Sequence, residues 1–331
     1  MKLLTISIAA YNVAQYLEQA LQSCIVPEIM DKLEVLIVND GSTDETPLIA
    51  HVYEKKYPQT FRLINKENGG YGSTINLSIK EAKGKYFKQL DGDDWFEQDG
   101  LKKLMHELEN TDADILITPM RKGPDVDAMI DVPICGQKTY VDLPVNEFHA
   151  TEIYGMWHLA IKMKVLQESN MVLPEHRLYT DQFLATIPFA YAKTIRFTDK
   201  PVYCYRIGRD GQSVSRESRI RHSEDALAVF EDLLQFFMTI KHCNCRAYLL
   251  DKIRLYYLAC LKTLCLDKIN RKKYLQIKKL DITIRNLSPE IYALSNIRGT
   301  KTFAFISLMR KTNYIAYYLI AFIPGGVPNW N

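Results

Sequence analysis

The sequence predicts an α/β fold, with a mostly parallel central sheet covered by helices on both faces, followed by a helical C-terminal region. Two observations predict this fold. In the first 120 residues, short apolar runs typical of β-strands alternate with stretches of helical periodicity. From Ser223 onward, the apolar periodicity is helical. We therefore expect two domains, residues 1–218 and residues 219–331.

The predicted elements follow one another in regular alternation. Strands are expected at residues 3–9, 33–39, 61–65, 86–90 and 113–118, and helices at residues 15–23, 44–57, 71–83 and 99–110. Residues 120–149 contain three prolines and no clear period, so we expect a loop with short strands there. A mixed stretch follows to about residue 216, before the helical region begins.

The bulk composition is that of a globular protein with an uneven charge distribution. The chain has 331 residues, 47% of them hydrophobic, and a formal net charge of +3. Between Lys241 and Lys311, however, sixteen Lys or Arg residues face only four Asp or Glu residues. Such a region favours an anionic partner, either acidic lipid headgroups or nucleic acid. The alternative is a set of solvated helix faces without a partner.

Other features bear on the compartment. The seven cysteines form no C-x-x-C pair, which favours reduced thiols in a cytoplasmic protein. The apolar run at residues 1–10 is short, is broken by Thr5 and Ser7, and leads straight into a strand pattern, so we do not interpret it as a signal peptide. No stretch reaches the roughly 20 apolar residues of a transmembrane helix.

Two aromatic-rich segments near the C-terminus differ from the rest of the chain. Residues 303–309 and 314–323 are apolar, and Arg310 and Lys311 lie between them. They are too short to span a bilayer, but they suit contact with a membrane surface. Ordinary packing of C-terminal helices is the alternative.

Polar residues follow four successive predicted strands. Asn12 follows the first strand, Asp40 the second, Asn68 to Gly70 the third and Asp91 to Asp94 the fourth. In open α/β sheets, ligands bind outside the carboxyl ends of the strands. We therefore expect these residues to gather at one edge of the sheet.

The turn after the fourth strand carries three carboxylates within four residues. Mg²⁺ or Mn²⁺ is commonly held by one or two carboxylates together with substrate phosphates, so Asp91 and Asp93 suit a metal-bound diphosphate. The metal would stabilise the charge that builds on a departing diphosphate. The alternative is an acidic turn without a ligand, because Asp and Gly favour turns.

Two further loops suit a nucleotide. Asp44 can cap the helix after the second strand, which leaves Asp40 available to accept hydrogen bonds from a nucleobase or ribose. The loop from Asn68 to Thr74 brings backbone amides to the sheet edge, as a phosphate-binding loop does. Ile75 stands where a dinucleotide-binding fingerprint needs glycine, and the chain has no P-loop, which argues against a dehydrogenase or an ordinary NTPase.

Taken together, residues 6–12, 38–44, 68–76 and 90–95 resemble the inverting family 2 glycosyltransferases of the GT-A fold, in order and in spacing. The resemblance implies that Ala10, Tyr11 and Asp40 bind the nucleoside, Asp91 the ribose or base, and Asp93 the metal, which would be Mn²⁺ or Mg²⁺. With the loops described above, the expected nucleotide-sugar contacts are Ala10, Tyr11, Asn12, Asp40, Asn68, Gly70, Asp91 and Gly92.

The resemblance continues more weakly toward residue 215. Such enzymes often carry an acidic pair before an apolar helix, and here Thr180 replaces the first acid while Asp181 keeps the position of the catalytic base. A helix N-cap is the alternative role for Asp181. Arg206 and Arg209 lie in a segment that resembles the one after the catalytic residue, and their guanidinium groups suit a diphosphate. We also expect Trp157 and His158 at the acceptor pocket, although core packing would explain Trp157 as well.

These expectations combine into one function. The chain would transfer a sugar from a nucleotide diphosphate, with a UDP-sugar as the first expectation, to a saccharide or a lipid-diphosphate-linked saccharide in bacterial surface polysaccharide synthesis. We expect it at the inner face of the plasma membrane, with no nucleic acid as partner. The sequence does not indicate an oligomeric state.

Two other functions stay open at this point. A sugar-nucleotide nucleotidyltransferase shares the general fold, but its first strand is followed by a glycine-rich loop with an arginine, whereas this chain has Ala10, Tyr11 and Asn12. The second alternative is a nucleotide-binding scaffold protein without turnover.

Overall fold

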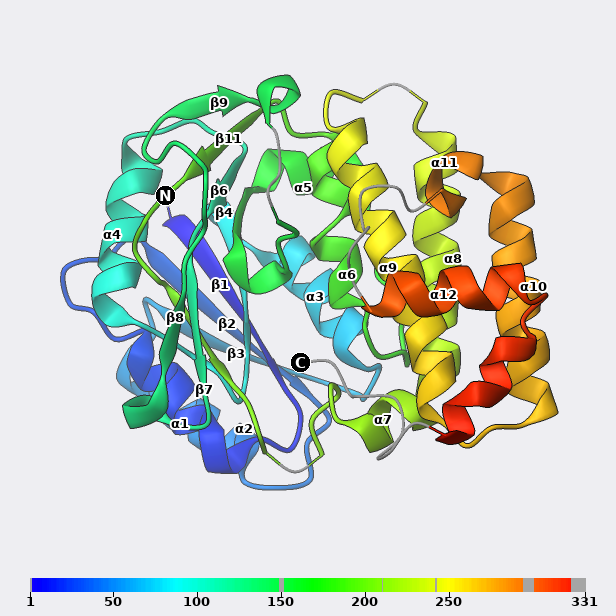
Figure 1. The fold of residues 1–331 in the computed structure, drawn as a ribbon. Helices are drawn as coiled ribbons and strands as arrows, with labels where there is room; N and C mark the ends of the chain where they lie inside the picture. The colour runs from blue at the N-terminus through cyan, green and yellow to red at the C-terminus, as the bar shows by residue number, and fades with distance from the viewer. Residues whose placement is uncertain (1, 149–151, 210, 242, 294–300, 323–331) are drawn as a thin grey trace. The chain divides into compact units, whose positions relative to one another are not determined.

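The computed structural model describes residues 2–148, 152–209, 211–241, 243–293 and 301–322 (Figure 1). The chain divides into two compact units. Unit 1 comprises residues 1–210 together with residues 243–245, and unit 2 comprises residues 211–242 and 246–331. The predicted α/β fold and the helical C-terminal region are both confirmed.

Unit 1 alternates strands and helices through its first half. Its strands are β1 (Lys2–Ala10), β2 (Leu33–Asp40), β3 (Phe61–Lys66), β4 (Gly84–Asp91), β5 (Trp95–Phe96), β6 (Ile115–Ile117), β7 (Met120–Gly123), β8 (Ile130–Val132), β9 (Asp142–Pro144), β10 (Leu159–Lys162), β11 (Thr194–Phe197) and β12 (Tyr203–Arg206). Its α-helices are α1 (Ala14–Ser23), α2 (Thr46–Lys56), α3 (Tyr71–Glu81), α4 (Gln98–Glu109), α5 (Met163–Ser169) and α6 (Asp181–Leu184). Short 3₁₀ turns are η1 (Val126–Ala128), η2 (Val145–Glu147), η3 (Met156–His158) and η4 (Ile187–Ala190).

The central sheet has eight strands in the order β3-β2-β1-β4-β10-β6-β11-β9. The strands β3, β2, β1 and β4 pair in parallel, and β10 runs antiparallel between β4 and β6. Every residue of β2 is buried, as expected of a parallel strand covered on both faces. Figure 1 shows the sheet between α1 and α4 on one side and α3 on the other.

The parallel pairing brings the ends of four strands to one edge. Residues Ala10, Asn39 and Asn65 are aligned across β1, β2 and β3, and Ala9 of β1 is aligned with Asp91 of β4. The loops that follow these strands therefore leave the sheet at the same edge. This is the arrangement that the alternation of strands and helices predicted.

Two features of unit 1 differ from the sequence prediction in detail. The strand expected at residues 113–118 is only three residues long, and β10 separates it from β4. A second sheet, in the order β5-β12-β7-β8, was not predicted as a unit. Strands of two to four residues leave no measurable alternation, and β12 pairs with strands about 80 to 110 residues earlier in the chain.

Unit 2 is helical in its described residues. It contains α7 (Arg216–Arg221), α8 (Ser223–Thr239), α9 (Arg246–Leu266), α10 (Arg271–Leu287), α11 (Pro289–Tyr292), α12 (Lys301–Lys311) and the 3₁₀ segment η6 (Ile315–Phe322). Within the described ranges, no helix combines the length and the apolar character that a bilayer-crossing segment needs.

A buried carboxylate holds several elements of unit 2 together. Asp281 of α10 is 1% exposed, and its oxygens accept hydrogen bonds from Tyr257 of α9, from Arg310 of α12 and from Tyr314 at 2.6 Å. The Arg310 guanidinium group also lies over the ring of Tyr292. Because this buried charge is paired and hydrogen-bonded, it can lie inside the helical core.

Lys88 of β4 is buried, and no carboxylate among the described residues pairs with it. Its ammonium nitrogen donates hydrogen bonds to the carbonyl oxygens of Trp157 (2.8 Å) and Leu159 (3.3 Å). The side chain is fully buried, and burial lowers the pKa of Lys88 from 10.5 to about 7. Lys88 therefore fixes η3 and β10 to β4 while its charged form is disfavoured in the folded state.

This burial makes the stability of unit 1 depend on pH. Above pH 7 the folded protein releases the Lys88 proton, whereas the unfolded chain keeps it up to about pH 10, so the unfolded state binds more protons and stability rises with pH in this window. Between pH 7 and pH 9 we expect the free energy of unfolding to rise by about 2 kcal/mol more in the wild type than in Lys88→Met. Urea unfolding at both pH values measures the difference. Equal changes in the two proteins would contradict the buried, neutral lysine.

Candidate functional site

The loop after β1 is joined to the loop after β2 by polar contacts. The backbone nitrogen of Asn12 donates to the Ser42 hydroxyl at 3.0 Å, and the Asn12 side-chain oxygen accepts from the backbone nitrogen of Thr43 at 2.8 Å. Asp44 accepts hydrogen bonds from the backbone nitrogens of Ala14 and Thr46 at 3.0 Å, so its carboxylate stabilises the starts of both α1 and α2. Asn12 thus shapes the loop, next to the exposed ring of Tyr11 and the buried Ala10.

Asp40 organises the loop that follows β3. Its carboxylate is buried and accepts hydrogen bonds from the backbone nitrogens of Gly69 (2.9 Å) and Gly70 (2.8 Å) and from the Lys66 ammonium (2.7 Å). The Asn68 side chain donates to the Asp40 carbonyl oxygen at 2.9 Å. Direct nucleoside binding by Asp40 and Asn68 remains a prediction, but their hydrogen bonds hold the loop at the start of α3.

Gly70 needs its glycine for a conformational reason. Its φ is +80°, a left-handed backbone conformation, and a Cβ there would lie 3.0 Å from the backbone nitrogen of His176. The chain turns at Gly70 into α3, whose first residue, Tyr71, donates from its hydroxyl to Asp91 at 2.6 Å. The loop after β3 is thereby connected to the end of β4.

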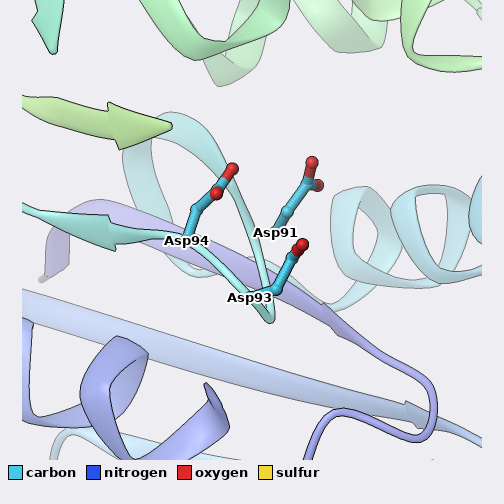
Figure 2. Close-up of side chains that lie close together, drawn as sticks. All are labelled: Asp91, Asp93 and Asp94. Carbon is cyan, nitrogen blue, oxygen red and sulfur yellow. The ribbon is translucent and has the colours of Figure 1, made fainter. Parts of the chain in front are cut away.

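Figure 2 shows the side chains of Asp91, Asp93 and Asp94 extending to the same side of the turn between β4 and β5. One carboxylate oxygen from each lies within 4.8 Å of the others. Gly92 has no room for a side chain, because a Cβ would lie 2.9 Å from the Ala9 carbonyl oxygen and from Val13. The glycine allows the turn to pack tightly against the end of β1.

The three carboxylates repel one another in a partly dry environment. Burial, followed by the negative charge of Asp93, raises the pKa of Asp91 to about 7. Burial and the charges of Asp93 and Asp91 raise the pKa of Asp94 well above its ordinary value. Asp94 is held by the Tyr203 hydroxyl at 2.6 Å and by the backbone nitrogen of Arg206 at 2.7 Å. Asp94 therefore has a structural function in the turn, and Asp91 and Asp93 are the freer pair.

The two arginines differ in how they contact this turn. Arg206 is 9% exposed; it donates to the Asp93 carbonyl oxygen at 3.0 Å and lies over the rings of Trp95 and Tyr16. Arg209 is more exposed and forms an ion pair with the Asp93 carboxylate. The buried Arg206 thus stabilises the backbone of the turn, whereas the Arg209 guanidinium group contacts a carboxylate of the turn.

Asp181 reaches the same neighbourhood from a distant part of the chain. The side chain of Asn76 in α3 forms hydrogen bonds of 2.8 and 2.9 Å with the backbone of Leu173, and the backbone nitrogen of His176 donates to the Gly69 carbonyl oxygen at 2.7 Å. These contacts lay the segment before α6 along the start of α3. Burial is the largest cause of the raised pKa of Asp91 and of Tyr71, and the charge of Asp181 adds to it in both.

The structure bears on the alternative role of Asp181. Thr180 occupies the N-cap position of α6, and Asp181 is the first residue of the helix. Tyr179, just before it, has a φ of +65°, which is a left-handed conformation that a residue with a side chain seldom adopts. Asp181 is therefore presented by a constrained turn and is not the N-cap of this helix.

The two residues expected at an acceptor pocket are placed differently. The Trp157 ring stacks on Tyr205, with ring centroids 5.6 Å apart and planes tilted by 18°. Burial, followed by the charges of Asp94 and Asp91, raises the pKa of Tyr205. His158 is buried, and its Nδ1 lies 2.7 Å from the Thr118 carbonyl oxygen. Trp157 and Tyr205 thus form an aromatic pair near the acidic turn, while His158 packs inside.

Several residues of the site did not stand out in the sequence. Tyr71, Tyr203 and Tyr205 contact or face the carboxylates, yet the chain has 20 tyrosines and no local pattern marks these three. The one available signal was their position in the sequence. Tyr71 directly follows Gly70, and the other two tyrosines come just before Arg206.

The donor set fits a hard divalent cation. All three candidate ligands are carboxylate oxygens, which Mg²⁺ and Mn²⁺ prefer, and the raised pKa values show a local excess of negative charge that a cation would relieve. The contacts of Asp94 with Tyr203 and Arg206 leave Asp91 and Asp93 as the residues best suited to bind the metal.

Comparison with known proteins agrees with this site. Residues 5–138 match the family described as glycosyl transferase family 2. EpsH of Bacillus subtilis (strain 168), a protein named as a glycosyltransferase, is 27% identical to this chain over 232 residues. The match covers 68% of this chain and 66% of EpsH. The matched region thus spans just under two thirds of that relative.

Solved structures show the same fold. The Staphylococcus aureus TarS fragment 1–349 in complex with UDP-GlcNAc superposes with a TM-score of 0.68 at 19% identity, covering 96% of this chain and 89% of that chain. The mannosyltransferase PcManGT from Pyrobaculum calidifontis, in complex with GDP-Man and Mn²⁺, superposes with a TM-score of 0.57 at 16% identity, covering 96% and 86%.

The family match begins in β1 and runs past the acidic turn, so it contains the first four strand ends and the loops that converge on Asp91 and Asp93. The fold of unit 1 is the one that the family resemblance predicted. Residues 5–138 therefore match the family 2 glycosyltransferases, and unit 1 has the GT-A fold.

Proposed function

We propose that this protein is an inverting glycosyltransferase that transfers a sugar from a nucleotide diphosphate to a saccharide acceptor, with a divalent metal held by Asp93 and Asp91. One observation carries the proposal: the segment before the candidate base Asp181 is hydrogen-bonded to the loop at the start of α3, and Tyr71 of α3 donates to the metal-type carboxylate Asp91, about 90 residues from Asp181 in sequence. The metal and the single base that this reaction needs would thus lie at the same edge of the sheet.

A UDP-sugar is the donor that we propose. The solved TarS complex contains UDP-GlcNAc, and TarS shares the fold of this chain at 19% identity. The loops that would contact the nucleotide follow β1, β2 and β3, where Tyr11 is exposed and Asp40 orders the backbone of Gly69 and Gly70. The metal would be Mn²⁺ or Mg²⁺; the PcManGT complex contains Mn²⁺.

The chemistry follows from the placement of the charged groups. Asp181 would accept the proton of the acceptor hydroxyl as its oxygen bonds to the anomeric carbon and the bond from that carbon to the diphosphate breaks. Positive charge develops on the sugar ring in such transfers. A bound metal would stabilise the negative charge on the leaving diphosphate. Arg209, which pairs with Asp93, would supply further positive charge for the same phosphates.

For the acceptor, we propose a saccharide or a lipid-diphosphate-linked saccharide of a bacterial surface polysaccharide. The Trp157 and Tyr205 pair offers an aromatic surface near the carboxylates, and the apolar face of a sugar ring packs well against such a surface. A lipid-linked acceptor would bring the enzyme to the inner face of the plasma membrane, with its active site in the cytoplasm.

Metal dependence provides the first test. We expect purified protein to release UDP slowly from at least one of a panel of UDP-sugars with Mn²⁺ present, and to lose this activity with EDTA. Asp93→Asn should weaken Mn²⁺ binding, followed by calorimetry with UDP present, by about tenfold or more, because it removes one of two charged ligands. Asp99→Asn is the matched control, since Asp99 in α4 is 94% exposed in its side chain.

Wild-type affinity for Mn²⁺ and UDP in Asp93→Asn would contradict the metal assignment. No UDP release from any UDP-sugar, together with no UDP binding, would contradict the transferase proposal and favour a scaffold protein. A panel that includes GDP- and dTDP-sugars separates a wrong nucleotide from a wrong reaction.

The catalytic base provides the second test. We expect Asp181→Asn to lower the turnover number for UDP release by about a hundredfold, because positioned general bases contribute rate factors of that order. The affinity for UDP with Mn²⁺ should stay within about twofold, because the base does not hold the nucleotide. An unchanged turnover number would remove Asp181 from the mechanism. Equal losses of binding and turnover would assign it to the donor site instead.

A further inference from the structure

The outer side of α12 and η6 is apolar, although it faces away from the helical core of unit 2. Leu308 is 41% exposed, Ile315 66%, Tyr318 43% and Leu319 49%. The inner side of the same segment is apolar too, because Met309, Tyr317 and Ile320 are buried. A helical segment that is apolar on both sides buries both sides, so its outer side requires a partner.

The exposed face of α10 is basic and carries apolar residues of its own. Arg271, Lys279 and Arg285 are exposed, and so are Leu275 and Ile282. The one acid of α10, Asp281, is buried and bound by Arg310 and Tyr314, so it contributes no negative charge to the surface. The sequence from residue 291 to residue 331 contains no Asp or Glu at all.

These two groups of side chains belong to one surface of unit 2. The Tyr274 ring of α10 stacks on Tyr318 of η6, with centroids 5.5 Å apart, and the Lys278 ammonium lies 5.9 Å from the Tyr314 ring centroid. We call the exposed residues Leu275, Lys279, Ile282, Leu308, Lys311, Ile315, Tyr318 and Leu319 the apolar-basic surface. Figure 1 shows its elements, α10, α12 and the segment after α12, in orange to red.

We propose that the apolar-basic surface docks on an anionic lipid bilayer. The exposed Leu, Ile and Tyr side chains would enter the region between headgroups and acyl chains, and Lys279 and Lys311 would contact acidic headgroups. A second copy of the chain fits less well, since it would place like charges together. Nucleic acid would leave the apolar residues without a function, because phosphate contacts need only the cations.

The sequence predicted part of this surface, and the structure extends it. Membrane contact was expected from residues 303–309 and 314–323, and the side chain of Phe303 and all of Ile323 lie outside the described residues. The basic region noted in the sequence includes α10, and the contact between α10 and η6 comes from the structure. Only the reason for membrane docking rests on the proposed function: a lipid-linked acceptor would lie in the bilayer that this surface contacts.

Vesicle binding by the full chain tests the proposal. We expect the protein to float with phosphatidylcholine vesicles that contain phosphatidylglycerol, and to bind pure phosphatidylcholine vesicles much less. Ile315→Ser/Leu319→Ser should weaken this binding by about tenfold or more, because two exposed apolar groups no longer enter the bilayer. The matched control is Leu48→Ser/Val52→Ser in α2, which removes two similarly exposed apolar residues with the same four-residue spacing.

The basic residues need a separate pair of variants. Lys279→Gln/Lys311→Gln should weaken binding to the anionic vesicles by about thirtyfold, since each of the two cations near such a surface contributes on the order of 1 kcal/mol. Lys55→Gln/Lys56→Gln changes the net charge equally, with both lysines exposed in α2, and should bind as the wild type does. Thermal unfolding of each variant checks that the fold is intact.

Each outcome is decisive. No flotation of the wild type, or equal losses in the α2 control variants, would overturn the proposal. So would a wild-type dimer in light scattering that Ile315→Ser/Leu319→Ser converts to a monomer, since the surface would then join two copies. Asp93→Asn should bind vesicles as the wild type does, so a failure of membrane docking is separable from a failure of the proposed reaction.

Discussion

Repulsion among three carboxylates in one short turn is the constraint on which the candidate site depends. Asp91, Asp93 and Asp94 lie too close together, in too dry a place, to be charged without compensation. The surrounding structure compensates unequally: Tyr203 and the Arg206 backbone hold the buried Asp94, whereas the Asp93 carboxylate pairs with Arg209, whose side chain is 29% exposed. Asp94 is therefore stabilised by packing and hydrogen bonds. At Asp91 and Asp93, a bound cation would relieve the remaining repulsion.

The same logic of paired buried charge recurs across both units. The hydrogen bonds that the Asp40 carboxylate accepts from the backbone nitrogens of Gly69 and Gly70 offset the cost of its burial. They also order a loop at the sheet edge. The buried Asp281 carboxylate accepts hydrogen bonds from Arg310 and from two tyrosine hydroxyls, and these bonds hold the helices of unit 2 together. Lys88 is the exception, because two carbonyl oxygens accept its hydrogen bonds and no carboxylate in the described part of the chain pairs with it. Its neutral form can make these contacts without the desolvation cost of an ion.

The strand ends that form the site could be predicted because their signals are local. Each of β1 to β4 is six or more residues long, contains at least three hydrophobic residues and is followed by polar turn residues, so both the strand and its end are visible in a short window of sequence. Asp91 and Asp93 were recognisable as metal-type residues for the same reason. Asp40 was recognisable as a residue of interest, but its hydrogen bonds to the loop after β3 join residues about 30 positions apart and have no local signature.

By itself, the sequence determined the α/β class, the alternation of strands and helices, the edge at which the polar loops meet and the resemblance to a glycosyltransferase family. These follow from periodicity and from short motifs, which depend on neighbouring residues only. Tertiary structure alone decided the insertion of β10 beside β4, the second sheet that carries Arg206, the arrival of Asp181 beside the start of α3 and the joining of α10 to η6. The physical reason is that each of these rests on contacts between segments far apart in the chain, where burial and hydrogen-bond satisfaction select one pairing among many that the local sequence permits.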